Sequence, residues 1–270
     1  NVGIVGGGLA GLATASALHA AGHAVTVYEA AERIGGRMGT VTMEGHPVDV
    51  GFHVLHTAYP ALQRWVDLDA LDAVAMDPST EVILPSQGKR LLLGDALRRP
   101  STLLPTLRSV GPFNALRLLR WRQRARGRDI EAPLDRPSQT IDAGLANQGF
   151  SKALRQRVLH PLFAGITLDP ERNEREAFAT FTWGAMAKGN MVMPKEGIVA
   201  VPRQLASYLP PASLRTGVAV EAVDATGVKI NGTRHEHDKV VLAVPQHVAA
   251  ALLNITTGSN ERRTTTMVYT

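Results

Sequence analysis

The sequence of 270 residues predicts an α/β fold that begins with a doubly wound parallel sheet. Three observations at the N-terminus support this prediction. An apolar run, Val2–Val5, is followed by a glycine-rich turn and then by a stretch of small residues, Leu9–Ala21, that suits a closely packed helix. A second apolar run, Ala24–Tyr28, follows and ends at the acidic residue Glu29. Strand, helix and strand in this order form the first half of a doubly wound unit.

The glycines of the turn have the spacing of a dinucleotide-binding fingerprint. Gly6 allows the chain to turn tightly out of the strand, Gly8 leaves room for a pyrophosphate, and Gly11 lets the helix pack closely on the sheet. The free N–H groups at the helix N-terminus and its positive dipole end then face the phosphates. Glu29 stands where the second strand ends, so its carboxylate can accept hydrogen bonds from a ribose.

A second glycine pair followed by a cation, Gly35-Gly36-Arg37, comes shortly after this unit. Nicotinamide-binding domains do not need this addition, whereas it brings a fixed positive charge back to the pyrophosphate. The stretch Gly6–Thr40 resembles the flavoprotein superfamily that holds amine oxidases, protoporphyrinogen oxidase and phytoene desaturases. The resemblance implies FAD as the cofactor. The segment Arg157–Ile166 resembles the desaturase-like branch of that superfamily.

Softer similarity to the same superfamily covers residues 48–55, 189–206 and 218–245. It implies that the first of these segments lies at the edge of the flavin ring and that the backbone at Val220 holds the adenine. His53 is more readily interpreted as a core or boundary histidine than as a flavin contact. Glu196 stands where the family usually has glycine, which argues against a close flavin contact there. The residues expected to contact the cofactor are Gly6, Gly8, Leu9, Ala10, Gly11, Glu29, Ala30, Gly36, Arg37, Gly51, Phe52 and Val220.

The resemblance also implies a domain organisation. Residues 1–57 form the first segment of the FAD-binding domain, 58–188 form an inserted, α-rich substrate domain that faces the membrane, and 189–250 return to the FAD-binding domain. Residues 251–270 begin a further substrate-domain segment. Family members continue with a strand and helix that complete the FAD-binding domain, so we expect a further C-terminal part beyond this chain.

Local patterns predict several elements within these domains. Residues 82–93 suit a hairpin, residues 141–183 suit a helical block, and Asp169-Pro170-Glu171 suits the start of a new helix because proline favours the first helical position. Residues 218–244 suit a three-stranded meander that begins with the strand Val218–Val223 and turns at Asn231-Gly232.

Positive charge is concentrated in one segment. The net charge is +5, and eleven Lys or Arg residues lie between Lys89 and Arg128. A helix is expected over Phe113–Arg126, with arginines on one side and apolar residues on the other. The apolar side comprises Phe113, Leu116, Leu119 and Trp121.

Two interpretations of the Arg98–Arg128 segment remain open. It is either an interfacial helix that lies on an acidic membrane and feeds lipophilic substrate to the flavin, or a surface helix with solvated arginines. Nucleic-acid binding is not expected, because aromatic residues make up only 5% of the chain and no recognised module surrounds the arginines.

Composition excludes several classes of protein and site. There is no cysteine, which excludes disulfides, thiol catalysis and a flavin attached through cysteine. No run approaches the ~18 to 20 apolar residues of a membrane span. His235-Glu236-His237 suits a solvated edge strand better than a metal site, so no metal is predicted. We expect a cytoplasmic protein that associates peripherally with the membrane.

These features predict a FAD-dependent oxidoreductase that oxidises or desaturates a hydrophobic, isoprenoid- or carotenoid-like molecule by hydride transfer to the flavin. One alternative is an amine or porphyrinogen oxidase of the same fold, and the low aromatic content argues mildly against an amine oxidase. The other alternative is a flavin- or lipid-binding protein without catalysis. The sequence identifies no catalytic acid or base.

Overall fold

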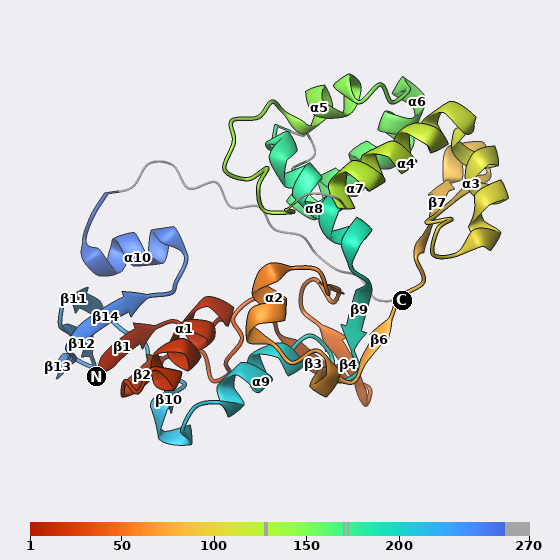
Figure 1. Cartoon of the computed structure of the whole chain (residues 1–270). Helices are drawn as coiled ribbons and strands as arrows, with labels where there is room; N and C mark the ends of the chain where they lie inside the picture. Colours follow the sequence, from red (N-terminus) through yellow and green to blue (C-terminus); the bar gives the residue numbers. More distant parts are fainter. Residues whose placement is uncertain (127–128, 170, 172, 257–270) are drawn as a thin grey trace.

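A parallel sheet of four strands, in the order β10-β2-β1-β14, organises the first part of the protein. The computed structural model describes residues 1–126, 129–169, 171 and 173–256. In Figure 1 this sheet and its covering elements lie apart from a second part that is rich in helices. β1 is central, because Ile4 lies opposite Val27 of β2 on one side and Val241 of β14 on the other.

The sheet is covered on both faces. On one face α1 and α9 pack against it, and Leu12 and Leu205 are buried with Ile4. On the other face the antiparallel meander β11-β12-β13 and α10 bury Val228 and Leu252. The elements of this part are β1 (Val2–Val5), α1 (Leu9–Ala20), β2 (Val25–Tyr28), α9 (Ala200–Ser207), β10 (Leu214–Arg215), β11 (Ala222–Asp224), β12 (Gly227–Ile230), β13 (Thr233–Glu236), β14 (Lys239–Leu242) and α10 (Gln246–Leu253).

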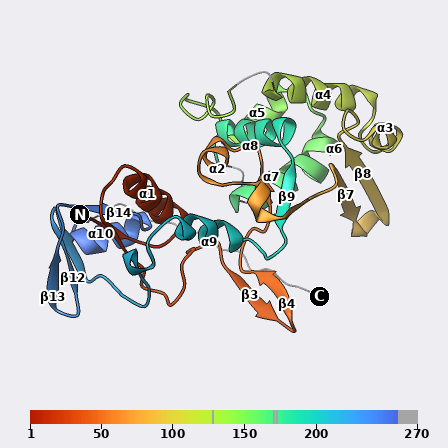
Figure 2. The same ribbon diagram turned by 60° about the horizontal axis from the view of Figure 1, so that its bottom comes forward.

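A small antiparallel sheet, β5-β9-β6, joins this part to the helices (Figure 2). The chain leaves along β5 and returns along β9, and the two passages are bonded to each other, since the Thr57 amide donates to the Asn190 carbonyl at 2.9 Å. Val66 and Leu71 are buried here with Ile198. The elements of this junction are β3 (Thr40–Met43), β4 (His46–Asp49), β5 (Leu55–His56), α2 (Pro60–Trp65), a 3-10 turn (Asp69–Leu71), β6 (Ala73–Ala75) and β9 (Met191–Pro194).

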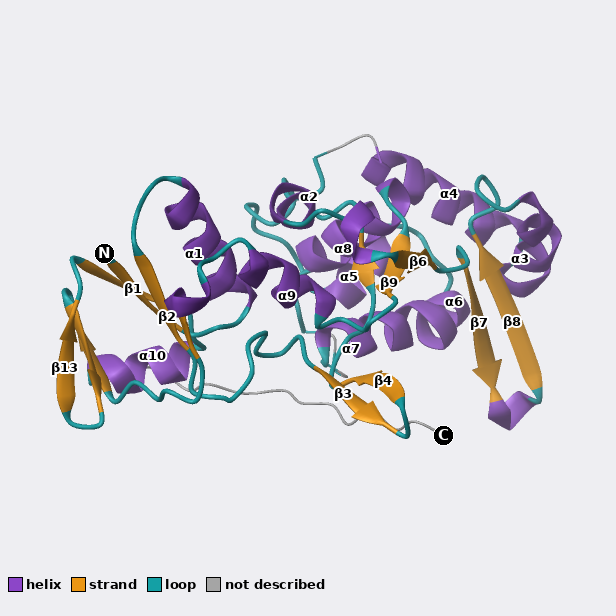
Figure 3. Cartoon of the chain, turned by 90° about the horizontal axis from the view of Figure 1, so that it is seen from below, coloured by secondary structure: helices purple, strands orange, loops and turns teal. Residues whose placement is uncertain are grey.

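The second part packs helices around Trp121, which is stacked on Trp183 with ring centroids 4.6 Å apart and is buried with Ile141 and Phe163. Figure 3 shows the helices of this part together, with the β7–β8 hairpin at their outer edge. No helix among the described residues is long and apolar enough to cross a bilayer. The elements are β7 (Ser79–Leu84), β8 (Lys89–Gly94), α3 (Leu103–Val110), α4 (Pro112–Arg126), α5 (Ile141–Asn147), α6 (Lys152–Leu154), a π-helical turn (Arg155–Leu159), α7 (His160–Thr167) and α8 (Glu176–Lys188), with 3-10 turns at Pro85–Gln87 and Pro100–Thr102. A further 3-10 turn, Pro211–Ser213, precedes β10 in the first part.

The structure confirms the predicted α/β fold class, the first helix, the hairpin over residues 82–93 and the helix that ends at Arg126. It corrects the orientation of that helix. Trp121 and Arg122 are both buried, whereas Phe113, Leu116 and Leu119 are exposed. The reason is tertiary, because α8 packs along the side of α4 that carries Trp121.

Three further expectations were wrong. The helix expected from Asp169 begins at Glu176 instead, because the Asp169 carboxylate accepts the backbone amides of Glu171 and Glu174 and holds a turn there. The first strand of the meander begins at Ala222, since the Val218 amide donates to the end of β2 rather than to the meander.

The third correction concerns His237, which is buried rather than solvated. Its Nε2 lies 3.0 Å from the Tyr28 hydroxyl, and its ring lies so close to β1 that a side chain at Gly3 would overlap it. Burial lowers the pKa of His237 and raises the pKa of Tyr28, while the nearby Arg215 partly offsets the latter. This pair joins the end of β2 to the meander.

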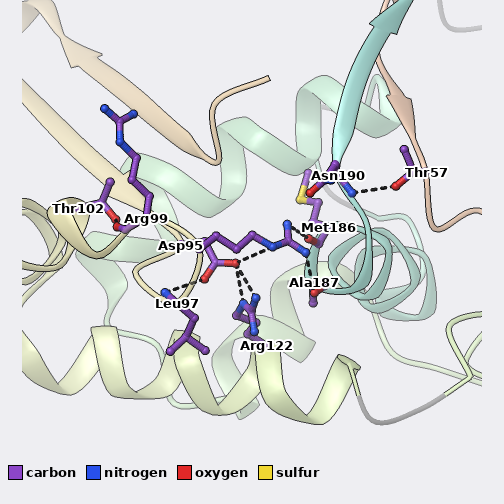
Figure 4. A network of polar contacts seen from close by, with 10 residues as sticks. Thr57, Asp95, Leu97, Arg99, Thr102, Arg122, Met186, Ala187 and Asn190 are labelled. Atoms are coloured by element: carbon purple, nitrogen blue, oxygen red, sulfur yellow. Dashed lines mark hydrogen bonds and ion pairs between the residues drawn. The ribbon is translucent and has the colours of Figure 1, made fainter. Parts of the chain in front are cut away.

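An ion network ties α4, α8 and the loop after β8 together in the helical part (Figure 4). The Asp95 carboxylate accepts from Nε of Arg122 at 2.8 Å and lies 3.5 Å from Nε of Arg98. Arg98 in turn donates to the carbonyls of Met186 and Ala187, at the C-terminal end of α8. The negative end of the helix dipole also attracts a cation at this position. The network therefore fixes the end of α8, just before the chain returns along β9.

Removing the buried guanidinium should destabilise the protein. Replacing Arg122 with methionine leaves the Asp95 carboxylate short of its closest partner, so we expect the free energy of unfolding to fall by about 3 kcal/mol. Urea unfolding measures it. The control is Arg120→Met, because Arg120 lies on the same helix but is exposed. Equal stabilities of the two variants would show that the network contributes little.

Candidate dinucleotide-binding site

The turn between β1 and α1 requires glycine at two of its positions. Gly6 has a φ of 109°, and a Cβ there would lie 2.6 Å from the Ala243 carbonyl oxygen. A Cβ at Gly11 would lie 1.9 Å from the Gly6 carbonyl oxygen. Both roles that the spacing predicts, a tight turn and a close helix–strand approach, therefore have a direct steric cause.

Gly8 differs from these two because nothing lies within 4 Å of the position of a Cβ built on it. It is the N-cap of α1, and no side chain caps the helix or brings an acidic group into its first turn. The amides of Leu9 and Ala10 lie in this first turn, where backbone N–H groups have no partner within the helix. The space beside Gly8 thus combines steric access with unused donors, which is what a phosphate group needs.

The Gly35-Gly36-Arg37 segment returns to this turn. The Gly35 amide donates to the Gly7 carbonyl at 2.8 Å, and a Cβ at Gly36 would lie 3.3 Å from the Gly8 Cα. Both glycines have positive φ, 104° and 55°, a conformation that residues with side chains rarely adopt. Arg37 follows directly and is exposed. Arg37 therefore directly follows two glycines whose backbone lies against the turn predicted to bind phosphate.

Both oxygens of the Glu29 carboxylate are held by backbone amides. Oε2 accepts from Gly7 at 2.7 Å and Oε1 accepts from Ala31 at 2.9 Å. The carboxylate is thereby oriented at the end of β2. Each of its oxygens keeps a further lone pair that can accept a hydrogen bond from a hydroxyl. A Cβ at Gly7 would lie 2.9 Å from the Glu29 Cβ, so the glycine also makes room for this side chain.

The segment that leads to Val220 lies beside Glu29. The Val218 amide donates to the Glu29 carbonyl and the Gly217 amide donates to the Ala31 carbonyl, each at 2.9 Å. Ala30, between these bonded positions, is exposed, and Val220 is half-buried against the cluster under the meander. The parts of the chain predicted to hold ribose and adenine are thus adjacent, and their contacts with the cofactor stay a prediction.

The segment predicted at the flavin edge is anchored by Asp49. Its Oδ1 accepts from the Thr40 hydroxyl at 2.5 Å and from the Ile198 amide at 2.9 Å, and the Thr40 hydroxyl accepts from the Val199 amide. A Cβ at Gly51 would lie 3.3 Å from the Arg37 carbonyl oxygen.

Neighbouring residues of this segment are open to solvent or partly so. Phe52 is 59% exposed and His53 is half-buried. Glu196 is exposed and pairs with Arg203 at 3.6 Å, and the expectation about a flavin contact at this position stays a prediction.

The sequence analysis missed Arg33. Its guanidinium lies 3.5 Å from the Gly36 carbonyl, and a Cβ at Gly39 would overlap it. It is therefore a second cation against the loop that carries Arg37. The sequence did contain a signal for Arg33, because it lies in the same short loop as Arg37. A pyrophosphate carries more than one negative charge and can therefore pair with two cations.

Comparison with known proteins decides the family. The family described as flavin-containing amine oxidoreductase matches residues 9–263. The chain belongs to this family. Its membership confirms the predicted superfamily and FAD as its cofactor, and the glycine turn, the uncapped helix and the oriented carboxylate fit such a group.

Relatives with curated functions include carotenoid-pathway enzymes. The chain is 28% identical over 291 residues to phytoene dehydrogenase of Streptomyces griseus, an alignment that covers 94% of this chain and 56% of that protein. It is 49% identical over 59 residues to zeta-carotene desaturase of a Synechocystis strain, covering 22% of this chain and 12% of that protein. The chain therefore spans little more than half the length of phytoene dehydrogenase.

Solved structures show the same fold. An oxidoreductase from Methanosarcina mazei superposes with a TM-score of 0.67 at 20% identity, covering 94% of this chain and 61% of that one. Cyclohexylamine oxidase from Brevibacterium oxydans superposes with a TM-score of 0.65 at 23% identity, covering 94% and 59%. These superpositions support the fold, and at such low identity they carry no argument about the substrate.

The open space at Gly8 gives a sharp test of the site. Gly8→Ala should leave the fold intact, because the added Cβ meets no protein atom, yet lower FAD affinity at least tenfold by blocking the phosphates. FAD retained per chain and urea unfolding measure the two effects. Gly165→Ala is the control, since a Cβ there also meets nothing. If Gly8→Ala binds FAD normally, the phosphates lie elsewhere.

Proposed function

We propose that this protein is a FAD-dependent oxidoreductase that oxidises or desaturates a hydrophobic, isoprenoid-like molecule by hydride transfer to the flavin. When bound, the flavin supplies the hydride acceptor. The observation that carries the proposal is the open space at Gly8, beside which lie the first turn of α1 and the returning Gly35-Gly36 backbone. Carotenoid desaturases among the curated relatives support the substrate class.

The contribution of the chain to this reaction is binding and orientation. Amides of the α1 N-terminus and the cations Arg33 and Arg37 neutralise the phosphates, while Glu29 orients the ribose. Asp49 holds the segment that leads to Gly51 and Phe52 against the residues just before α9, and this segment would lie along the flavin when the cofactor is bound. No described side chain is assigned as a proton donor or acceptor in the transfer.

The proposed substrate class is tested by flavin bleaching. FAD-loaded protein should lose its flavin absorbance when it is incubated without oxygen with phytoene or zeta-carotene, because the substrate delivers two electrons to the flavin. Putrescine and coproporphyrinogen III are the comparison substrates, since oxidases of both kinds are among the similar proteins. Bleaching by either of these alone would favour the amine or porphyrinogen oxidase alternative. Bleaching by none of them would favour a non-catalytic binding protein.

We also propose that the protein meets an acidic membrane through α3 and α4, within the Arg98–Arg128 segment. Leu104 and Phe113 are 62% and 77% exposed, and Leu103 and Leu116 beside them are exposed too. Exposed arginines flank this apolar surface at Arg108, Arg120 and Arg124. Apolar side chains that enter a bilayer and cations that pair with anionic headgroups together suit peripheral attachment, which we expect at the cytoplasmic face.

Removing the two largest exposed apolar groups should weaken membrane attachment. The double variant Leu104→Ser with Phe113→Ser loses about 3 to 6 kcal/mol of apolar transfer free energy, so we expect at least a tenfold loss of binding to phosphatidylglycerol vesicles. Vesicle sedimentation measures it. Ile83→Ser is the control, because Ile83 is equally exposed but lies on β7. Unchanged sedimentation of the double variant would remove α3 and α4 as the contact.

A further inference from the structure

Four aromatic rings form a row from the junction sheet to α8. The His56 ring, on β5, meets the Tyr59 ring edge-to-face at a centroid distance of 5.2 Å. The Tyr59 ring is stacked on Phe181 of α8 at 5.3 Å with an angle of 2° between the planes. Phe181 is followed by Phe178 at 6.2 Å. We call these four residues the aromatic row.

The aromatic row belongs to none of the four hydrophobic clusters among the described residues. Side chains alternate along a strand, so Leu55 packs into the junction cluster while His56 points to the opposite side, toward α8. On α8 the small residues Ala179 and Ala185 are buried, whereas Phe181 is half-buried and Phe178 is 36% exposed. The row is therefore a partly open wall. It begins a few residues after the segment proposed to lie at the flavin edge.

One polar atom in this wall has no partner. Nδ1 of His56 is buried, and among the described residues nothing forms a hydrogen bond with it. Burial lowers the pKa of His56, and no charged side chain contributes to that shift. The imidazole is therefore neutral at neutral pH. A charged ligand group would find no side chain of opposite charge beside it. A buried nitrogen of this kind is satisfied when a ligand supplies the missing hydrogen bond.

We infer that the aromatic row binds a flat, apolar molecule that carries one neutral hydrogen-bonding group, a hydroxyl or carbonyl, which His56 Nδ1 holds. Tyr59 and Phe181 are stacked on each other, and the apolar surface that this pair shares with the exposed Phe178 ring suits packing against a conjugated chain. This inference rests on the proposed function and adds a preference to its substrate class: an oxygenated isoprenoid binds more tightly than the matching hydrocarbon, which still binds through the apolar rings. A hydroxyl satisfies either tautomer of the imidazole, and a carbonyl satisfies the one with its proton on Nδ1.

Two probes separate the polar contact from the apolar one. Retinol and axerophthene share one conjugated chain and differ only in the retinol hydroxyl, and both quench tryptophan fluorescence by energy transfer. For the FAD-loaded protein we expect retinol to bind about tenfold more tightly than axerophthene, because a site built for a hydrogen bond penalises the analogue without it. In the His56→Phe variant the affinity for retinol should fall to the affinity for axerophthene, and the affinity for axerophthene should stay unchanged. Phe181→Leu should weaken both.

The controls keep the result specific. His23→Phe changes an exposed histidine far from the row and should behave as the unmodified protein. Equal affinities for the two probes in the unmodified protein overturn the inference without any variant, and so does a preference for retinol that survives in His56→Phe. Binding of neither probe also overturns it. FAD content and bleaching by phytoene are measured on the same samples, so failure of the flavin chemistry is distinguished from failure of this inference.

Discussion

The close approach of Gly11 to the Gly6 carbonyl is the constraint on which the first part of the protein depends. A single added carbon would lie 1.9 Å from that oxygen, so α1 can cross β1 at this angle only with glycine at this position. Because the crossing is tight, the N-terminus of α1 opens onto the carboxyl end of the sheet. Gly7 then receives Glu29, and Gly35 closes the turn from the other side. The predicted cofactor site is thus a consequence of helix–strand packing.

A second set of contacts holds the junction between the two parts. Asp49 joins the hairpin before it to the start of α9, and Thr57 is bonded to Asn190 where the chain returns. Arg98 fixes the end of α8 just upstream of that return. Polar groups therefore control the path of the chain through the junction, while the apolar clusters on either side supply the bulk of the burial.

Local sequence signals predicted what is locally determined. The glycine spacing, the small-residue helix and the Asn231-Gly232 turn depend on backbone conformation, so each could be predicted from a few neighbouring residues. The burial of Trp121 and His237 depends on partners more than fifty residues away, Trp183 and Tyr28, which no local pattern encodes. The domain boundaries and the individual cofactor contacts stay predictions. The prediction for residues beyond 256 lies outside the described residues.

The order of strands has a consequence for how the protein is made. β1 leaves the ribosome well before its neighbour β14, from which it is separated by more than 200 residues of chain, yet it is central in the finished sheet. At 5 to 20 residues per second, one edge of β1 stays unpaired for roughly 10 to 50 seconds. An apolar strand with an open edge is a template for pairing with other chains. Nascent copies thus depend on protection of Val2–Val5 until the second half of the chain arrives.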